Sequence, residues 1–482
     1  MHLEDSELLR SKAYVNGRWL DADTRASVMD PATGQELAQV PMLGEEAVQQ
    51  AIDAAELAFH GWRTLSGHER ARRLYRWYEL MHEHLGDLAQ IMTAEQGKPL
   101  AEAKGEIRYA ASFVQWFAEE AKRSYGDIIP SPRPGQKLLV SREPVGVVAA
   151  ITPWNFPAAM ITRKVAPALA AGCTAVVKPA LETPLSALAL AELAERAGIP
   201  AGVFNVVTGD AEVIGKVLTS SAKVRKLSFT GSTRIGSLLM AACAPDIKKL
   251  SLELGGNAPF IVFDDADLDA AIEGVMAAKF RNAGQTCVCA NRIYVQDRIY
   301  DDFAERLAIA MNTLTLGKGT EPGVTTGPLI NQAAVDKVRA HIADATSKGA
   351  NIRLGGQAHE KGPLFFQPTL LTDMNKEMRI AAEETFGPVA PLFRFIDEAD
   401  AIAAANDSPF GLAAYFYTTD LARAFRVADA LESGMVGVNT GLVSNEVAPF
   451  GGVKASGLGR EGSKYGMEEY QELKYICLDG LG

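Results

Sequence analysis

Cys287 stands where a thiol could do chemistry. It lies in Phe280-Arg-Asn-Ala-Gly-Gln-Thr-Cys-Val-Cys289, between a helical pattern over 268–280 and a strand expected to begin near Arg292. A short loop between two ordered elements holds a side chain rigidly and leaves it accessible, and a thiolate there is a nucleophile. A buried, inert cysteine is the alternative interpretation, since that is the commonest role of this residue.

A carboxylate and two possible anion sites occupy similar junctions. Glu253 ends an apolar run in Leu252-Glu-Leu-Gly-Gly256, where an apolar setting raises the pKa of a carboxyl and suits a general base; a surface charge is the alternative. Lys178 closes Ala175-Val-Val-Lys-Pro179, where its ammonium could meet a phosphate. Phe229-Thr-Gly-Ser-Thr-Arg-Ile-Gly236 runs from strand through glycine turn to helix start, which offers backbone donors to an anion.

One segment matches a dinucleotide-binding motif in its residues but not in its structural context. Gly457-Leu-Gly-Arg-Glu-Gly462 matches GxGxxG, but a glycine-rich stretch over 449–456 precedes it instead of a strand, so we reject it as a phosphate site. The first strand of the alternating region runs instead into Thr152-Pro-Trp-Asn-Phe-Pro157. That stiff turn stands at a strand's carboxyl end, where α/β proteins bind ligands.

The elements that position these residues alternate between strands and helices. Helical patterns cover 67–84 and 101–123, and from Val145 short apolar runs at 145–151, 175–178, 203–207 and 226–229 alternate with helical patterns at 158–170, 184–197, 211–218 and 235–242. A second run has strand candidates at 292–295, 392–395, 413–417 and 436–438. This pattern predicts an α/β protein with two doubly wound parallel-sheet domains, divided near Gly255-Gly256.

Composition narrows the class of partner. The net charge of −11 argues against nucleic acid and anionic membranes, and the longest apolar stretch, 165–177, falls short of the ~20 residues of a membrane span. The N-terminus lacks a signal-peptide pattern, so we expect a cytoplasmic protein. Five scattered cysteines fit a reducing compartment, and the sole close histidine pair, His82 and His84, has the wrong helical spacing for a metal.

Taken together, these segments resemble the aldehyde dehydrogenase superfamily along essentially the whole chain. The motifs that carry the likeness are Thr152–Pro157, Lys178-Pro, Phe229-Thr-Gly-Ser, Leu252-Glu-Leu-Gly-Gly, Gly284-Gln-Thr-Cys and Glu383-Glu-Thr-Phe-Gly-Pro388. Within the superfamily the chain is most similar to the succinate-semialdehyde dehydrogenases, through 158–164, 280–292 and 444–450.

The resemblance implies a reaction and residues for it. Cys287 would attack the aldehyde, Asn155 and the Cys287 N–H would hold the oxyanion, and Glu253 would activate the water that hydrolyses the thioester. The implied cofactor contacts are Thr152, Pro153, Trp154, Lys178, Ala180, Leu181, Gly231, Ser232, Leu254, Glu384 and Phe386. The implied contacts to the substrate carboxylate are Arg163, Arg281 and Ser444, and no metal is expected.

The implied substrate is succinate semialdehyde, which is oxidised to succinate, with glutarate semialdehyde as a competitor. A CoA-acylating dehydrogenase and a non-catalytic binding protein of the same fold stay open as alternatives. NADP is favoured and NAD remains open, because Leu181 replaces a glutamate with which NAD-preferring relatives often bind the adenosine ribose.

The resemblance also divides the chain by role. It implies a cofactor-binding domain over 1–123 and 145–255, a catalytic domain over 256–455, and oligomerisation segments at 124–144 and 456–482, the latter with a C-terminal strand. We expect a homotetramer or homodimer. For Cys289 two roles are open, a packing residue or a disulfide partner of Cys287, and the first is favoured.

Overall fold

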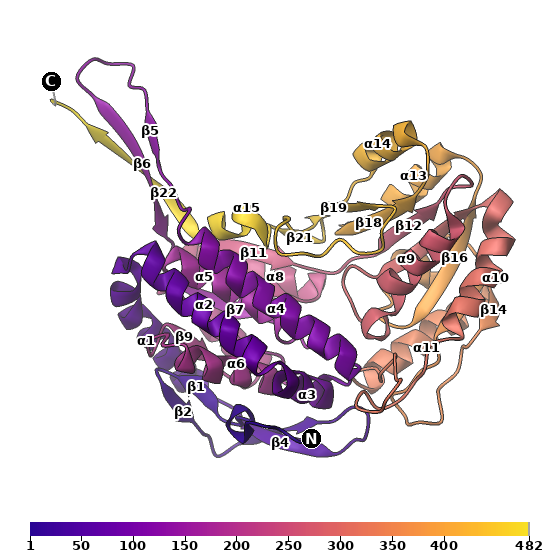
Figure 1. Ribbon diagram of the computed structural model, residues 1–482, viewed down its shortest axis with the longest axis horizontal. Helices are drawn as coiled ribbons and strands as arrows, with labels where there is room; N and C mark the ends of the chain where they lie inside the picture. Colours follow the sequence, from indigo (N-terminus) through magenta and orange to yellow (C-terminus); the bar gives the residue numbers. More distant parts are fainter. Residues whose placement is uncertain (481–482) are drawn as a thin grey trace.

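The apolar runs of the sequence form two large sheets, one in each half of the chain (Figure 1). The structure is a computed structural model that describes residues 1–480. The first sheet has eight strands in the order β2-β1-β9-β8-β7-β10-β11-β21, and the second has seven in the order β14-β15-β16-β13-β12-β18-β19. Both are parallel except at their edges, so the predicted fold class is confirmed.

The first sheet is doubly wound. Its parallel strands β7 to β11 stand in the spatial order 9-8-7-10-11, so the winding reverses between β7 and β10. Its strands are β1 (Ala13–Val15), β2 (Arg18–Leu20), β7 (Val147–Ile151), β8 (Thr174–Lys178), β9 (Phe204–Val206), β10 (Val224–Thr230), β11 (Lys249–Glu253) and β21 (Gly457–Leu458). Its helices are α1 (Glu45–Thr64), α2 (Gly67–Glu83), α3 (Leu85–Gln96), α4 (Leu100–Glu120), α5 (Ala159–Ala171), α6 (Pro184–Arg196), α7 (Ala211–Ser220) and α8 (Thr233–Cys243).

Alternation along the strands gives this sheet two cores. In β7, Val148 and Ala150 pack toward α5 and α6, whereas Val147 and Ala149 pack toward α1 and α7. Both faces of the sheet are therefore covered, as expected for parallel strands that are apolar on both sides. Helices α2 to α4 form a further layer over α5 (Figure 1).

The second sheet is likewise covered by helices on both faces, and its strand β12 pairs with β13 and β18. Its strands are β12 (Ala258–Val262), β13 (Ala290–Gln296), β14 (Asn351–Leu354), β15 (Thr369–Met374), β16 (Val389–Phe395), β18 (Ala413–Tyr417) and β19 (Met435–Val438). Its helices are α9 (Leu268–Phe280), α10 (Tyr300–Met311), α11 (Gln332–Ser347), α12 (Arg379–Ala382), α13 (Glu398–Asn406) and α14 (Leu421–Ala430). Helices α9 and α10 cover one face, and α11, α13 and α14 cover the other.

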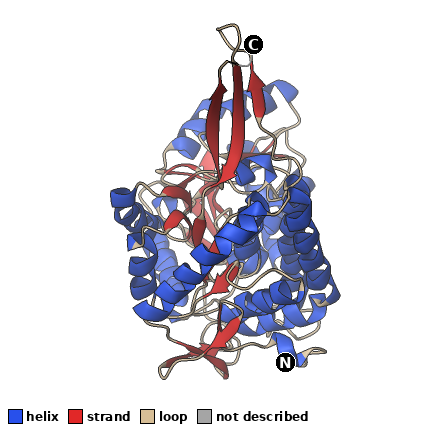
Figure 2. Cartoon of the chain, turned by 90° about the vertical axis from the view of Figure 1, so that its left-hand side faces the viewer, coloured by secondary structure: helices blue, strands red, loops and turns tan. Residues whose placement is uncertain are grey.

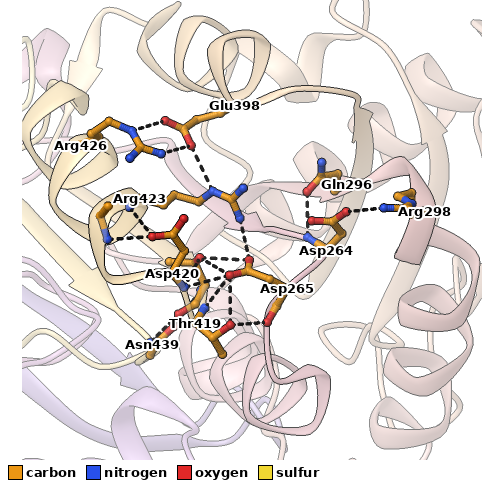
Figure 3. A network of polar contacts seen from close by, with 12 residues as sticks. Asp264, Asp265, Gln296, Arg298, Glu398, Thr419, Asp420, Arg423, Arg426 and Asn439 are labelled. Atoms are coloured by element: carbon orange, nitrogen blue, oxygen red, sulfur yellow. Dashed lines mark hydrogen bonds and ion pairs between the residues drawn. The ribbon is translucent and has the colours of Figure 1, made fainter.

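An ionic cluster lies at the carboxyl ends of β12 and β18 of this sheet (Figure 3). Asp265, just after β12, accepts hydrogen bonds from the Thr419 and Asp420 N–H groups, both at 2.9 Å, where the chain leaves β18 for α14. Arg423 of α14 bonds Asp265 at 2.7 Å and Glu398 of α13 at 3.0 Å. The cluster therefore joins two strands to two helices.

A narrow three-stranded sheet projects from the body and carries the C-terminus (Figures 1 and 2). It consists of β5 (Asp127–Ile129), β6 (Lys137–Pro144) and β22 (Gln471–Leu478), in the order β22-β6-β5. The proline-rich stretch 130–134 lies in the turn that joins β5 to β6. We call this sheet the arm.

Several short elements had no sequence signal. The N-terminal strands β1 and β2 extend the first sheet, and β3 (Arg25–Met29) pairs with β4 (Glu36–Pro41). After the second sheet, β20 (Val453–Lys454) pairs with β17 (Phe410–Gly411), and the short helix α15 (Ser463–Glu468) packs on α4 and α5. Among residues 1–480, no helix is long and apolar enough to cross a membrane.

Candidate active site

The carboxyl edge of the first sheet gathers the predicted residues. Asn155 follows β7, Lys178 ends β8, Gly231 follows β10 and Glu253 ends β11. Since the winding reverses between β7 and β10, a crevice opens at this edge, which is where doubly wound sheets bind ligands. The rejected GxGxxG segment is an edge strand here, because Gly457 pairs antiparallel with Glu253.

Cys287 reaches this edge from the second sheet. Helix α9 ends in a tight 3-10 turn over Arg281–Gly284, in which Asn282 and Ala283 adopt positive φ angles of 52° and 54°. The chain then passes Gly256, where a Cβ atom would stand 2.4 Å from the Cys287 carbonyl oxygen. Glycine is therefore required there for the thiol loop to lie against the end of the first sheet.

The thiol is half-buried and protonated at neutral pH. Burial raises the pKa of Cys287 to about 12, although the positive charge of Arg163 acts in the opposite direction. Glu384 and Glu253 raise the pKa further. The thiol must therefore lose its proton during the reaction instead of resting as a thiolate.

Glu253 is a buried carboxyl with an unusual environment. Neither of its oxygens accepts a hydrogen bond from any residue in 1–480. Burial raises its pKa well above the usual range, Glu461 adds to the effect, and Arg163 and Lys164 oppose it. A carboxyl with a raised pKa and free oxygens is suited to exchange protons with a water or a thiol.

Asn155 supplies a donor beside the thiol. Its amide nitrogen donates one hydrogen bond to the Gln285 carbonyl oxygen at 3.0 Å, which leaves the second amide hydrogen without a partner within residues 1–480. The Cys287 N–H likewise has no acceptor in that range. Two free donors next to one thiol can stabilise an oxyanion that forms on the attacked carbon.

A cavity of about 360 Å³ opens on this arrangement. Its lining includes nine of the predicted residues, namely Pro153, Trp154, Asn155, Gly231, Ser232, Leu254, Cys287, Glu384 and Phe386. The predicted residues Thr152, Lys178, Ala180 and Leu181 lie outside that lining. Of these, Lys178 is buried, and burial lowers the pKa of its ammonium.

Two aromatic rings and a carboxyl shape this cavity. Trp154 and Phe386 meet edge to face with their ring centroids 5.6 Å apart, and Phe386 holds a positive φ of 56°. Burial raises the pKa of Glu384 to about 7, while the Gly256 N–H donates to it at 3.2 Å. Glu384 can therefore either accept or donate a hydrogen bond near neutral pH.

A second cavity, of about 280 Å³, lies on the other side of the Asn155-Phe156 turn. Arg281 and Ser444, both predicted substrate contacts, line it together with Tyr109 and Phe156. The Arg281 guanidinium stands 4.7 Å from the centre of the Phe156 ring. A positive charge on an aromatic wall is suited to an anionic group at one end of a small molecule.

Arg163, the third predicted substrate contact, has a protein partner. Its side chain is buried, and it pairs with Glu461 at 2.8 Å and stacks on Phe450 at 3.9 Å. Its charge and that of Arg281 both lower the pKa of buried Tyr109, although burial raises that pKa more strongly. Arg163 thus lies near the second cavity but is bonded to Glu461.

Some residues of the site were not predicted from the sequence. Glu461 and Lys164 form a buried ion pair, and Lys337 of α11 lines the larger cavity. Glu102, Glu106 and Tyr109 follow one another at helical spacing on α4 and line the second cavity. That polar stripe on a helix otherwise rich in alanine and phenylalanine was an available signal.

Cys289 differs from Cys287 in its surroundings. It is fully buried, and its thiol donates to the Lys279 carbonyl oxygen at 3.4 Å. Both cysteines are free thiols in the structure. These contacts agree with the favoured packing role.

Comparison with known proteins finds relatives that match this chain along nearly its whole length. A model described as the aldehyde dehydrogenase family matches residues 19–476. The NADP(+) succinate-semialdehyde dehydrogenase of Escherichia coli is 65% identical over 480 residues, which cover 99% of this chain and 100% of the relative. A glutarate-semialdehyde dehydrogenase of Pseudomonas aeruginosa is 63% identical over 483 residues and the full length of both proteins.

The fold is equally close to that of a solved structure. The crystal structure of an NADP-dependent enzyme of Escherichia coli superposes with a TM-score of 0.99 at 65% sequence identity, and it covers 99% of this chain and 100% of that one.

Proposed function

This chain belongs to the aldehyde dehydrogenase family, and we propose that it oxidises succinate semialdehyde to succinate with NADP. The observation that carries the proposal is that Cys287 and Asn155 line one cavity, while Phe156, the next residue along the chain, lines a second one. The larger cavity has the aromatic and polar lining of a cofactor site. The smaller one carries Arg281 and Ser444, which suit the far carboxylate of a semialdehyde.

The residues around the larger cavity fit NADP. Trp154 and Phe386 provide walls, half-buried Glu384 can bond a ribose hydroxyl, and Gly231-Ser232 opens α8, whose N-terminus attracts a pyrophosphate. The Lys178 ammonium makes no hydrogen bond within residues 1–480, so it is available to the adenosine ribose. Thr152, Ala180, Leu181 and Leu254 complete the proposed set, and Leu181 brings no carboxylate that would repel a 2′-phosphate.

We assign the chemistry to three side chains. The Cys287 thiol gives its proton to water and the resulting thiolate attacks the aldehyde carbon, and the oxyanion that forms is held by the Asn155 amide and the Cys287 N–H. NADP held by the residues of the larger cavity would supply the hydride acceptor, and loss of hydride from that carbon leaves a thioester on Cys287. Glu253 then takes a proton from a water that attacks the thioester, and succinate is released.

Arg281 and Ser444 are the proposed contacts of the substrate carboxylate, with Arg163 adding its positive charge from its pair with Glu461. Arginine suits this role because its planar fork binds a carboxylate through two parallel bonds. Glutarate semialdehyde is the second candidate, since a relative with that name is 63% identical. One extra methylene changes transition-state binding by only ~1–3 kcal/mol.

Two alternatives of another class are less well supported. CoA-acylating dehydrogenases transfer the thioester to coenzyme A and typically lack the glutamate that Glu253 matches, so hydrolysis is favoured here. A binding protein without catalysis would not need a thiol and two free donors at one cavity, nor a buried carboxyl with free oxygens whose charge acts on that thiol.

We further propose a domain division, an assembly and a location. Residues 1–123 and 145–255 would bind the cofactor, 256–455 would carry the nucleophile, and 124–144 with 456–482 would assemble a homodimer or homotetramer. The exposed apolar residues of the arm support assembly, among them Ile128 at 79% and Leu473 at 68% exposure. The free cysteines of residues 1–480 support a reducing, cytoplasmic location.

Steady-state kinetics over an aldehyde panel test the proposal. Succinate semialdehyde, glutarate semialdehyde and butanal are each assayed with NADP and with NAD, and free coenzyme A is added in a parallel series. We expect the highest kcat/KM for succinate semialdehyde with NADP and no acyl-CoA product. A preference for butanal, or a hundredfold preference for NAD, would contradict the substrate or the cofactor assignment separately.

A further inference from the structure

A buried ion pair lies directly beneath the turn that carries Asn155. Lys98 follows α3, and Glu106 belongs to α4; the Lys98 ammonium contacts the Glu106 carboxylate at 2.5 Å, and both side chains are 1% exposed. Removing two charges from water is costly, and apolar residues often stabilise a core as well or better. The position of this pair therefore calls for a role beyond packing.

Both partners bond the turn between β7 and α5. The Lys98 ammonium donates to the Asn155 carbonyl oxygen at 2.8 Å and stands 4.1 Å from the centre of the Phe156 ring. The second Glu106 oxygen accepts from the N–H groups of Ala158 and Ala159, at 3.0 and 3.3 Å, where α5 begins. The pair thus holds the turn both at Asn155 and three residues later.

The same carbonyl is held from the thiol side. The Asn282 amide donates to the Asn155 carbonyl oxygen at 3.1 Å and to the Gln285 carbonyl oxygen at 3.2 Å. Gln96 fixes Asn282 through a 3.0 Å bond to its side-chain oxygen. Because Gln285 also accepts the Asn155 amide, the oxyanion donor and the thiol loop share one buried network.

We propose that Lys98, oriented by Glu106, is a positioning residue that sets where the Asn155 amide stands relative to Cys287. The inference rests on the proposed function, because it needs Asn155 to stabilise an oxyanion. Lys98 holds the Asn155 carbonyl oxygen through its ammonium. Asn282, itself held by Gln96, donates to the same oxygen from the segment that leads to the nucleophile. The amide is then aimed before substrate arrives, which is what electrostatic stabilisation requires.

A double-mutant cycle tests this role. The charge-neutral pair Lys98→Met with Glu106→Gln is made in the parent enzyme and in Asn155→Ala, and the rate constant of the first-turnover burst of NADPH is measured. Misplacing a catalytic group by an ångström can cost about a hundredfold, so we expect about a ten- to hundredfold loss in the parent. In the Asn155→Ala background the further loss should stay below about threefold, because the group being positioned is absent.

Lys226→Met is the matched control. Lys226 is equally buried, donates to Ser251 at 2.6 Å and lies 3.6 Å from Glu469, in the same sheet but remote from the Asn155 turn. It should lower the urea midpoint of unfolding and leave the burst rate unchanged. Binding of NADPH, followed by its fluorescence, should be the same in all folded variants.

Equal fold losses in both backgrounds would overturn the proposal, since the pair would then act on the site by a route other than Asn155. If the paired variant does not fold, Gln96→Leu goes through the same cycle, because Gln96 reaches the Asn155 carbonyl through Asn282 without carrying charge. The aldehyde used is the one that the parent oxidises fastest. A parent without any aldehyde oxidation would refute the proposed function and this inference with it, whereas equal losses in an active parent refute the inference alone.

Discussion

Burial makes both reactive groups of the site harder to ionise. It raises the pKa of the Cys287 thiol to about 12 and the pKa of the Glu253 carboxyl well above its usual range. Arg163 opposes both shifts, and its own partner is Glu461. Burial also raises the pKa of Glu461, but the charges of Lys164 and Arg163 outweigh it and lower that pKa. Glu461 therefore stays ionised beside two groups whose pKa values are raised by burial.

Cys287 and Glu253 should fail in distinguishable ways when replaced. Cys287→Ala should fold, bind NADP and give no reduced cofactor, because no thioester can form. Glu253→Gln should give a burst close to one equivalent per site and then turn over about 10²- to 10⁴-fold more slowly, the usual contribution of a general base. Stopped-flow absorbance measures both phases.

Cys477→Ala is the control for the thiol, since Cys477 is exposed and lies on the arm. It should keep the parent burst. Full steady-state turnover by Glu253→Gln would remove Glu253 as the base, whatever the burst amplitude.

Arg281 should determine the preference for acidic aldehydes. Its guanidinium lines the smaller cavity, and losing a charge-assisted contact costs ~1.5–3 kcal/mol, or about ten- to a hundred-and-fiftyfold in kcat/KM. Arg281→Met should lose that much with succinate semialdehyde and little with butanal. Kinetics with both aldehydes measure the difference.

Arg108→Met is the matched control, because Arg108 is exposed and precedes Tyr109 on α4 without lining the cavity. It should leave both aldehydes unaffected. Equal losses on both aldehydes in the Arg281 variant would mean that Arg281 shapes the site and does not bind the carboxylate.

Among the elements, the two sheets contribute opposite ends to the site. The first sheet presents the carboxyl ends of its strands, whereas the second presents the segments that precede β12 and β13, where Gly256 and Cys287 lie. The carboxyl ends of the second sheet carry the Asp265 cluster instead (Figure 3). That cluster therefore stabilises the half that holds the nucleophile from the edge remote from the chemistry.

Asp265→Asn should destabilise this half without slowing catalysis. Burial raises the pKa of Asp265, but hydrogen bonds from Thr418, Thr419 and Asp420 outweigh burial and lower that pKa below its ordinary value. A carboxyl with a lowered folded-state pKa stabilises the protein above its unfolded pKa of ~4, and this contribution is lost as pH falls through the folded value. We expect a cost of ~1–3 kcal/mol at pH 7 that shrinks below about pH 4.

Urea unfolding followed by circular dichroism measures this cost, because all five tryptophans precede residue 155 and report on the first half. Asp264→Asn is the control: the Asp264 carboxylate bonds only exposed Arg298, at 3.4 Å, and its loss should cost at most ~1 kcal/mol (Figure 3). Equal midpoints for the Asp265 variant and the parent at pH 7 would remove the cluster as a source of stability.

For the whole molecule, the sequence predicted what depends on local pattern. The helix expected over 268–280 is α9 with the same bounds, and the strands β7 to β10 fall within a few residues of their apolar runs. Motif spacing predicted one site for Cys287, Asn155 and Glu253; in the structure Cys287 and Asn155 line one cavity, and the charge of Glu253 acts on the pKa of Cys287.

Contacts between residues far apart in the chain could not be predicted from the sequence. Strand β1 joins the first sheet by pairing Tyr14 with Val206, and a three-residue strand has no periodicity to read. Lys164 meets Glu461, 297 residues away, and Lys98 meets Asn155, 57 residues away. Pairing between remote charges depends on how the sheets assemble, so it had no local signal. This is also why Arg163, expected to bind substrate, was not expected to bind Glu461.

The arm exposes large apolar side chains to solvent in the monomer. Its strand β22 should therefore make the contact between subunits. Leu473 and Tyr475 project from the same face of β22, since they are two residues apart, and they are 68% and 61% exposed. Leu473→Lys with Tyr475→Lys should lower the mass measured by light scattering after size-exclusion chromatography, because two charges would be buried in the interface.

Glu472→Gln is the control, on the opposite face of the same strand. It should keep the mass of the parent. A parent that is itself a monomer would refute assembly altogether. An oligomeric parent whose double-lysine variant keeps the same mass would instead place the subunit contact away from this face of β22. The circular dichroism spectrum of the variant must match that of the parent, since β22 also pairs with β6 over eight residues from Gln471 to Leu478.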